Sequence, residues 1–417
     1  MGKVSIDQLV PGMQLAQDVL APNGRKLLPQ GRQIERRHIQ TFKAWGVTEV
    51  EVVKDNVAQA AFRPKVSQHH LDRARDLLKP FFLLTNTQKE PLKTIFKLAW
   101  QQTALQLAHG QKAKNIREIP SVAQLKDLAS YEPEQLQDPD TLIAEEIQLL
   151  TLPDIYHRIM EVLNSPRSSA VHVAEVVSKD SSLSAKLLKL VNSPFYGFNT
   201  KVDTISRAIA LLGVNKLVTL AQGIAVVRVF RDIPSQIVDM HAFWKHSVGC
   251  GVLAKLLAAQ KAGLEEERFF VAGLLHDIGR MIMFKSMPLM MSRCILLSLQ
   301  NRVILQQAEK QLLKFDHAAL GQKLCAKWLL PQNLSDMISC HHAPMQTSTL
   351  TIEAGIVHTA DILCHALGLG LSGNVFVPDI DLKTWNKLQI SNSALQPVIS
   401  QSDRQIKEIV NIFLDKE

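Results

Sequence analysis

The residues with the clearest chemical potential are an adjacent histidine and aspartate, His276 and Asp277, inside the otherwise apolar run GLLHDIGR at residues 273–280. A buried carboxylate costs several kcal/mol unless a cation, hydrogen-bond donors or a metal ion compensates it. The neighbouring imidazole makes a metal ion the first candidate. The alternative is structural: Asp277 caps a helix or pairs with Arg280, and His276 is a hydrogen-bonded core histidine.

Further side chains that can bind a metal ion lie on both sides of this pair, in segments with helical spacing. Imidazole nitrogen and carboxylate oxygen together suit iron, manganese, nickel or zinc. No cysteine lies at a spacing that would favour a structural zinc site. In chain order the candidates are His246, His276, Asp277, His317, His341, His342 and Asp361.

The order of these residues resembles the HD superfamily of metal-dependent phosphohydrolases, and more closely its HDOD branch, the HD-related output domain. Chance does not account for so many matching segments in one order. The resemblance covers residues 141–370, about half of the chain. Besides LLHDIG, the matching segments are LKLVNSPFYG (188–197), AIALLG (208–213), FWKHS (243–247), HAALG (317–321), WLLP (328–331), HHAP (341–344) and HTADIL (358–363).

This resemblance implies a mainly α-helical, HD-like bundle with a metal-binding tetrad of His246, His276, Asp277 and Asp361. The resemblance also implies a possible second metal site. In related enzymes, a pair of metal ions activates a water and holds a phosphate. The second site would use His317, His341 and His342, which could instead serve helix packing or a ligand pocket.

Two departures from the active relatives bear on catalysis. Relatives that hydrolyse cyclic di-GMP carry Gly-Tyr-Pro after their paired histidines, whereas this chain reads HHAPMQ at 341–346. Arg280 stands where many active relatives have lysine, which keeps a phosphate-binding cation but changes its geometry. Asp277 and Arg280 therefore remain only candidate catalytic residues.

Two functions follow as hypotheses. The first is a regulatory, non-catalytic signalling protein that senses a ligand or partner and works through protein contacts. The second is a metal-dependent phosphohydrolase acting on a nucleotide or cyclic dinucleotide, with hydroxide generated on a metal ion and Arg280 or a lysine stabilising the phosphate. The expected partners are a signalling protein and a nucleotide-type ligand.

Composition limits the remaining classes. The longest apolar stretches, such as 217–230, are interrupted by polar residues, so we expect no transmembrane helix and a cytoplasmic protein. Residues 63–97 carry eight Lys or Arg against three Asp or Glu, but no recognition motif accompanies them. We therefore expect a solvated helix face and no nucleic acid. The five cysteines are odd in number and lack a CxxC pair, which predicts reduced thiols.

Length favours two or three domains. Turn signals and a short helix at 34–45, followed by the alternating strand 47–53, predict a small mixed α/β module at residues 1–58. Its phrases LVPGM, AQDV and WGV are similar to the accessory domain often found ahead of HD-type signalling domains. The further expected parts are a helical connector and polar linker at 59–140, the HDOD helical domain at 141–370, and a C-terminal helical extension at 371–417.

Local signals within the helical part give four more predictions. The apolar run 268–284 predicts one central helix. Asp180 can cap the helix that follows it. Asn192 and Ser193 are expected to satisfy backbone groups at a helix end, a structural role for the NSPFYG segment. Residues 372–377 could form a short hairpin before a final helix at 403–414.

Overall fold

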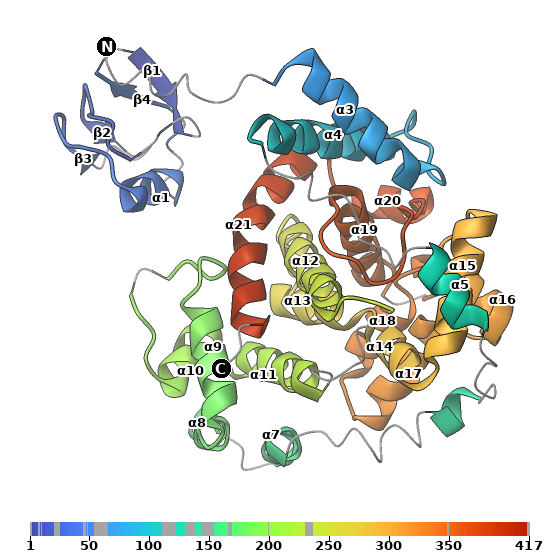
Figure 1. Cartoon of the computed structure of the whole chain (residues 1–417). Helices are drawn as coiled ribbons and strands as arrows, with labels where there is room; N and C mark the ends of the chain where they lie inside the picture. Colours follow the sequence, from blue (N-terminus) through green and yellow to red (C-terminus); the bar gives the residue numbers. More distant parts are fainter. Residues whose placement is uncertain are drawn as a thin grey trace. The chain divides into compact units, whose positions relative to one another are not determined.

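The computed structural model describes residues 2–6, 9, 11–20, 26–44, 47, 49–53, 66–110, 122–130, 138–142, 154–165, 169–198, 200–229, 237–347 and 350–414. The chain divides into two compact units, an N-terminal unit of residues 1–68 and a helical unit of residues 69–417 (Figure 1). Among the described residues, strands occur only in the first unit. The predicted fold class is confirmed.

The N-terminal unit contains two small antiparallel sheets and one helix. Strand β1 (Gly2–Ser5) pairs with β4 (Glu49–Val52), and β2 (Val19–Leu20) pairs with β3 (Lys26–Leu28). In β4, Val50 and Val52 are buried while Glu49 is exposed, as alternation predicts. The helix is α1 (Arg36–Ala44), within the span 34–45 predicted from the sequence.

The helical unit holds the remaining described elements. They are α3 (Gln68–Leu78), η2 (Lys79–Phe82), α4 (Leu92–Ala108), α5 (Val122–Ser130), α7 (Asp154–Asn164), α8 (Ala170–Ser178), α9 (Ser181–Val191), α10 (Ile205–Leu212), α11 (Val214–Val229), α12 (Met240–Ala258), α13 (Glu266–Leu275), α14 (Ile278–Ser286), α15 (Pro288–Asn301), α16 (Leu305–Leu313), α17 (His317–Lys327), α18 (Gln332–Ser339), η3 (Pro344–Gln346), α19 (Thr351–Leu367), α20 (Leu382–Leu388), η4 (Asn392–Ala394) and α21 (Leu395–Leu414).

Helix α12 is the centre of this unit. It is buried from His246 to Ala258 and packs against α13, α19 and α21 (Figure 1). The crossing with α13 is close because glycines face each other: a Cβ on Gly251 would lie 2.5 Å from the Phe270 carbonyl oxygen, and one on Gly273 would lie 2.7 Å from the Gly251 Cα. This crossing sets His246 beside the end of α13.

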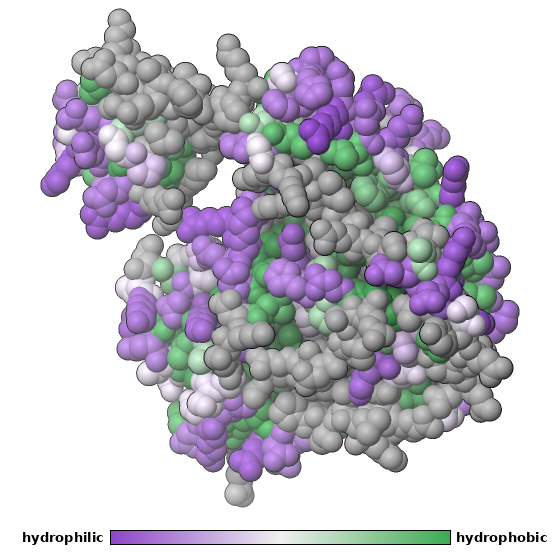
Figure 2. Space-filling view, in the orientation of Figure 1, coloured by the Kyte–Doolittle hydropathy of each residue, from purple (hydrophilic) through white to green (hydrophobic). Residues whose placement is uncertain are grey.

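From residue 69 onward, the described parts of the expected connector and of the extension lie in the same compact unit as the HDOD segment. Leu78 and Ile95, from α3 and α4, join its hydrophobic core, as does Ile409 of α21. The exposed face of α3 carries both charges, including Asp72 and Arg73, and Figure 2 shows it as hydrophilic. The division of residues 59–417 into three functional parts stays a prediction.

Two local predictions were wrong. The run 268–284 forms two helices, α13 and α14, separated by His276 and Asp277. Neighbouring residues of a continuous helix diverge by about 100°, so a break is needed for both side chains to reach one interior cluster. Residues 372–377 form no hairpin, because the segment's amides bond to other elements: Leu371 N to Ala242 O at 3.0 Å and Val377 N to Phe81 O at 2.8 Å.

The predicted caps are confirmed. The Asp180 carboxylate accepts from Leu183 N at 2.8 Å at the start of α9. At its end, the Asn192 side chain donates to Val202 O and accepts from Val202 N, both at 2.7 Å. The Ser193 hydroxyl donates to Leu190 O at 2.7 Å. The NSPFYG segment thus fixes the turn from α9 toward α10.

Among the described helices, none alone combines the length and apolar composition needed to cross a membrane, although one sharply bent pair, 266–286 with 288–301, meets both criteria together.

Candidate functional site

The four residues of the expected tetrad meet inside the helical unit. His246 comes from α12, His276 and Asp277 from the α13–α14 junction, and Asp361 from α19. His246 Nε2 lies 3.1 Å from Asp361 Oδ1, and His276 Nε2 lies 3.2 Å from Asp277 Oδ2. The four residues are each at most 4% exposed. We call them the tetrad.

Ligand atoms of His246, His276 and Asp277 lie within 4.8 Å of one another, and His276 Nε2 lies 3.6 Å from Asp361 Oδ1. Both nitrogens of His246, Nε2 of His276, Oδ2 of Asp277 and Oδ1 of Asp361 are buried without a hydrogen bond. His276 Nδ1 donates to Gly273 O at 2.7 Å, which turns Nε2 toward the carboxylates. Buried, unsatisfied nitrogens and carboxylate oxygens of this kind fit a divalent cation.

The buried carboxylates of the tetrad attract positive charge. Burial opposes a proton on His276, but the neighbouring Asp277 raises the pKa of its imidazole well above the ordinary value. Burial likewise opposes ionisation of Asp361, yet His365 and His246 hold the pKa of its carboxyl well below the usual range. The two carboxylates therefore stay charged and draw positive charge into the cluster.

His365 is a fifth member of this cluster that sequence reasoning missed. It lies one turn after Asp361 on α19, and its Nε2 is 3.2 Å from Asp361 Oδ1. Its ring centroid is 4.7 Å from that of His246. The spacing of four residues from Asp361 was the available signal, because such residues share a helix face.

The three histidines of the possible second site also converge. His317 begins α17, and His341 and His342 occupy the turn after α18. His317 Nε2 lies 3.4 Å from His341 Nε2 and 3.0 Å from His342 Nε2. Burial lowers the pKa of His341 to about 3 and holds that of His342 well below its usual range. Both imidazoles are therefore neutral, as metal ligands must be.

Arg280 lies between this triad and Asp277, fully inside the protein. Its Nη1 is 2.8 Å from Asp277 Oδ1, and its Nε is 2.9 Å from Glu309 Oε1. Asp277 occupies the N-cap position of α14 without a capping hydrogen bond from its side chain. Of the two structural roles considered for Asp277, the ion pair with Arg280 is therefore formed and the helix cap is not. Burial opposes the charge of Asp277, but Arg280 and His276 hold its pKa well below the usual range.

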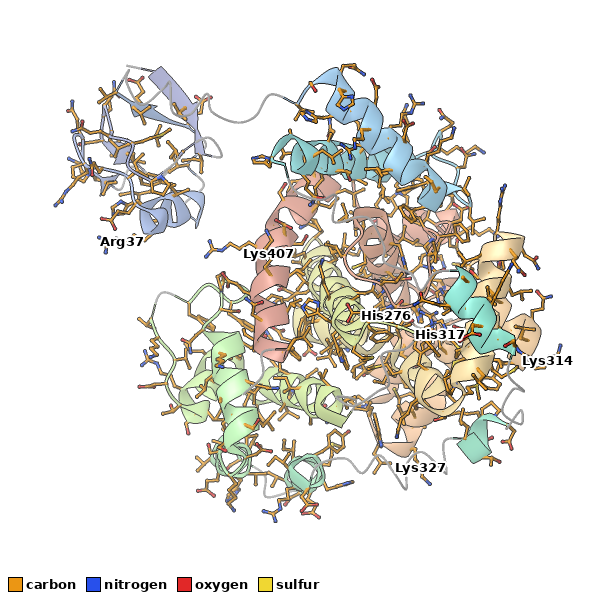
Figure 3. All side chains as sticks on the ribbon, in the orientation of Figure 1. Arg37, His276, Lys314, His317, Lys327 and Lys407 are labelled. Carbon is orange, nitrogen blue, oxygen red and sulfur yellow. The ribbon has the colours of Figure 1, made fainter. Side chains whose placement is uncertain are left out.

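Glu309, from α16, is a second residue that sequence reasoning missed. It is completely buried. Besides Arg280, its carboxylate accepts from the His317 backbone amide at 3.1 Å and lies 2.6 Å from His317 Nδ1. Glu309 therefore holds both Arg280 and His317 in place. Figure 3 shows His276 and His317 inside the helical unit.

Comparison with known proteins agrees with this geometry. Residues 149–344 match the model of the HDOD domain. An uncharacterized protein of Treponema pallidum is 24% identical over 216 residues, which are 50% of this chain and only 41% of that protein. The crystal structure of an HDOD domain protein with unknown function from Geobacter sulfurreducens is 26% identical, with a TM-score of 0.52, over 66% of this chain and 97% of that one.

Two more distant structures share the fold. One is a putative phosphohydrolase from Shewanella amazonensis, 23% identical, with a TM-score of 0.52 over 65% of this chain and 98% of that one. The other is a putative signal transduction protein from Marinobacter aquaeolei, 19% identical, with a TM-score of 0.50 over 75% of this chain and 72% of that one. Residues 149–344 thus match the HDOD domain model, in agreement with the order of the histidine and aspartate residues, and a solved HDOD domain protein has a similar fold.

Proposed function

We propose that this chain is a regulatory HDOD protein that acts through protein contacts and does not turn over a substrate. The observation that carries the proposal is the sealing of the tetrad. Residues 368–381, which we call the covering segment, run without helix or strand after α19, and residues 371–378 are all buried. A hydrolase needs a phosphate and a water at its metal ion, whereas the tetrad and the segment packed on it are both buried.

The covering segment is tied to the cluster at three points. Leu371 N donates to Ala242 O beside His246, the Ser372 hydroxyl accepts from Arg280 Nη1 at 3.1 Å, and Asn374 Nδ2 lies 3.4 Å from His365 Nε2. Gly370 packs so closely that a Cβ there would lie 2.4 Å from His246 N. These contacts make the segment part of the core.

Arg280 is also unable to serve a phosphate. It is 2% exposed, and its guanidinium is committed to Asp277, Glu309 and Ser372. A phosphate-binding arginine needs its planar fork open to the ligand. The cation expected to stabilise a phosphate in the hydrolase hypothesis is therefore already neutralised by two carboxylates of the protein.

The tetrad itself suits a structural cation, for which iron, manganese, nickel and zinc are the candidates. Such an ion, when bound, supplies positive charge at Asp361 and at Oδ2 of Asp277, the oxygen that faces away from Arg280. The protein's own part is to hold α12, the α13–α14 junction and α19 around it. The covering segment also bonds to η2 through Val377 and Phe81, so a ligand or protein partner acting on residues 69–108 has a direct route to the cluster.

A metal-dependent phosphohydrolase acting on nucleotides or cyclic dinucleotides is the second candidate. The observation that favours it is the set of buried, unsatisfied tetrad atoms. It requires the covering segment to open, so that substrate can reach His246 and Asp277. Cytoplasmic location and a nucleotide-type ligand remain part of both proposals.

We expect Mn²⁺, Fe²⁺, Ni²⁺ or Zn²⁺ to raise the thermal unfolding midpoint of the full chain. At about 100 times Kd a single bound ion contributes about 2.7 kcal/mol, which corresponds to about 5 °C for a chain of this size. Asp361→Ala should abolish the shift. Asp403→Ala, on the surface of α21, is the matched control and should keep it. An equal shift in Asp361→Ala, or none with any of the four ions, would contradict a cation in the tetrad.

A further inference from the structure

Asp277 lies between two groups of potential metal ligands. Its Oδ2 faces the tetrad, 3.2 Å from His276 Nε2 and 3.7 Å from His246 Nε2. Its Oδ1 faces the other way and lies 3.1 Å from His317 Nε2. A carboxylate placed in this way could bridge two cations, one on each side.

The second side already holds a cation that belongs to the chain. Arg280 Nη1 lies 2.8 Å from Asp277 Oδ1, and Arg280 Nη2 lies 3.1 Å from His317 Nε2. The guanidinium therefore touches the two atoms that an ion between Asp277 and His317 would have to engage. Glu309 and Ser372 bind the rest of the fork, at 2.9 Å and 3.1 Å, so the arginine is fixed from four directions.

The histidines behind it are arranged for a metal ion. His317, His341 and His342 each offer a ring nitrogen within 4.8 Å of the others. His341 Nδ1 donates to Ile338 O at 2.6 Å, which turns its Nε2 toward His317. His317 Nδ1 is set against Glu309 Oε2, the carboxylate–histidine pairing common behind metal ligands. This triad has ligand geometry, but a positive charge lies beside it.

We propose that Arg280 is a built-in second cation, which limits this chain to one divalent ion in the tetrad and keeps the His317–His341–His342 triad without one. The inference rests on the proposed function, since it assumes a cation in the tetrad. It also gives a chemical reason for the proposed absence of turnover: without a second ion, no pair of metals clamps the attacking and leaving oxygens of a phosphate.

The test uses the full chain with Arg280→Gln, which removes the charge, and Arg404→Gln on the surface of α21 as a matched control. Each protein is loaded with Mn²⁺, dialysed, and assayed for bound ions per chain by mass spectrometry. The expected result is one ion in the wild type and in Arg404→Gln, and two in Arg280→Gln. The extra ion should disappear in the double variant Arg280→Gln/His342→Ala, because His342 belongs to the triad.

Electron paramagnetic resonance supplies a second readout that does not depend on the variant folding. Two Mn²⁺ ions about 3.5–4 Å apart are exchange-coupled, whereas wild type should give the spectrum of isolated Mn²⁺ even at saturating ion. A coupled pair in the wild type, or no additional ion in a folded Arg280→Gln, would overturn the role of Arg280. A wild type without any ion refutes the tetrad cation instead, and an ion gained only by Arg280→Gln would still support the arginine's role.

Discussion

Replacing Gly279 by alanine is expected to lower the free energy of unfolding of the helical unit by about 3 kcal/mol or more. Gly279 lies where α14 crosses α17 at backbone contact. A Cβ at this position would lie 2.1 Å from the His317 carbonyl oxygen and 2.7 Å from the Gly321 amide nitrogen. Because these are backbone atoms at the start of α17, relief requires the helices to separate, which would displace His317 from Asp277.

Gly223→Ala is the matched control for this prediction. Its new Cβ would meet side-chain atoms, the Val271 methyl groups at 3.1 and 3.2 Å and Leu274 Cδ2 at 3.7 Å, and side chains can shift where backbone cannot. Alanine also gains about 1 kcal/mol of helix propensity over glycine. Urea unfolding followed by circular dichroism should therefore show a large loss for Gly279→Ala and little change for Gly223→Ala. Equal midpoints would show that α14 and α17 do not need their close contact.

Glu309→Ala is expected to cost about 3 to 5 kcal/mol, the range for breaking a buried ion pair from one side. Glu309 is completely buried and binds Arg280 Nε at 2.9 Å and the His317 amide at 3.1 Å. Without it, Arg280 keeps only Asp277 as a carboxylate partner. Removing the Glu309 carboxylate should also let the His317 ring move, since its Nδ1 lies 2.6 Å from that carboxylate.

Two variants separate charge from packing in this second prediction. Glu309→Gln retains an oxygen acceptor and should lie between wild type and Glu309→Ala. Gln311→Ala, on the exposed side of α16, should change stability by no more than about 0.5 kcal/mol. Chemical denaturation curves for the three variants provide the measurement. If Glu309→Ala were as stable as Gln311→Ala, Arg280 would not depend on Glu309 for its position.

The sequence predicted the tetrad because each of its members lies in a segment that matches the HDOD pattern. It also predicted the caps at Asp180 and Asn192, which depend only on near neighbours in the chain. Local chemistry of this kind is readable from residue types. The same holds for the mixed N-terminal unit, where turn signals and the alternation in β4 are local.

The features that the sequence did not predict depend on contacts between residues far apart in the chain. Glu309 looks like an ordinary polar residue of an amphipathic helix, and only packing shows that it faces Arg280, 29 positions away. An apolar run gives no local signal for the helix break at His276. The break allows His276 and Asp277 to reach the same interior cluster, which depends on distant residues. The covering segment was expected to form a hairpin; it instead satisfies its amides with Ala242 and Phe81, which no local pattern reveals.

The most direct test of the central claim is turnover by the metal-loaded full chain. Purified protein with Mn²⁺, Fe²⁺, Ni²⁺ or Zn²⁺ is incubated with a panel of nucleotides and cyclic dinucleotides, beside Asp277→Asn as a nearly isosteric control. The account predicts that wild type releases product no faster than Asp277→Asn or the protein-free blank. Hydrolysis of any panel member by wild type that is lost in Asp277→Asn would contradict a sealed, regulatory site and establish the phosphohydrolase.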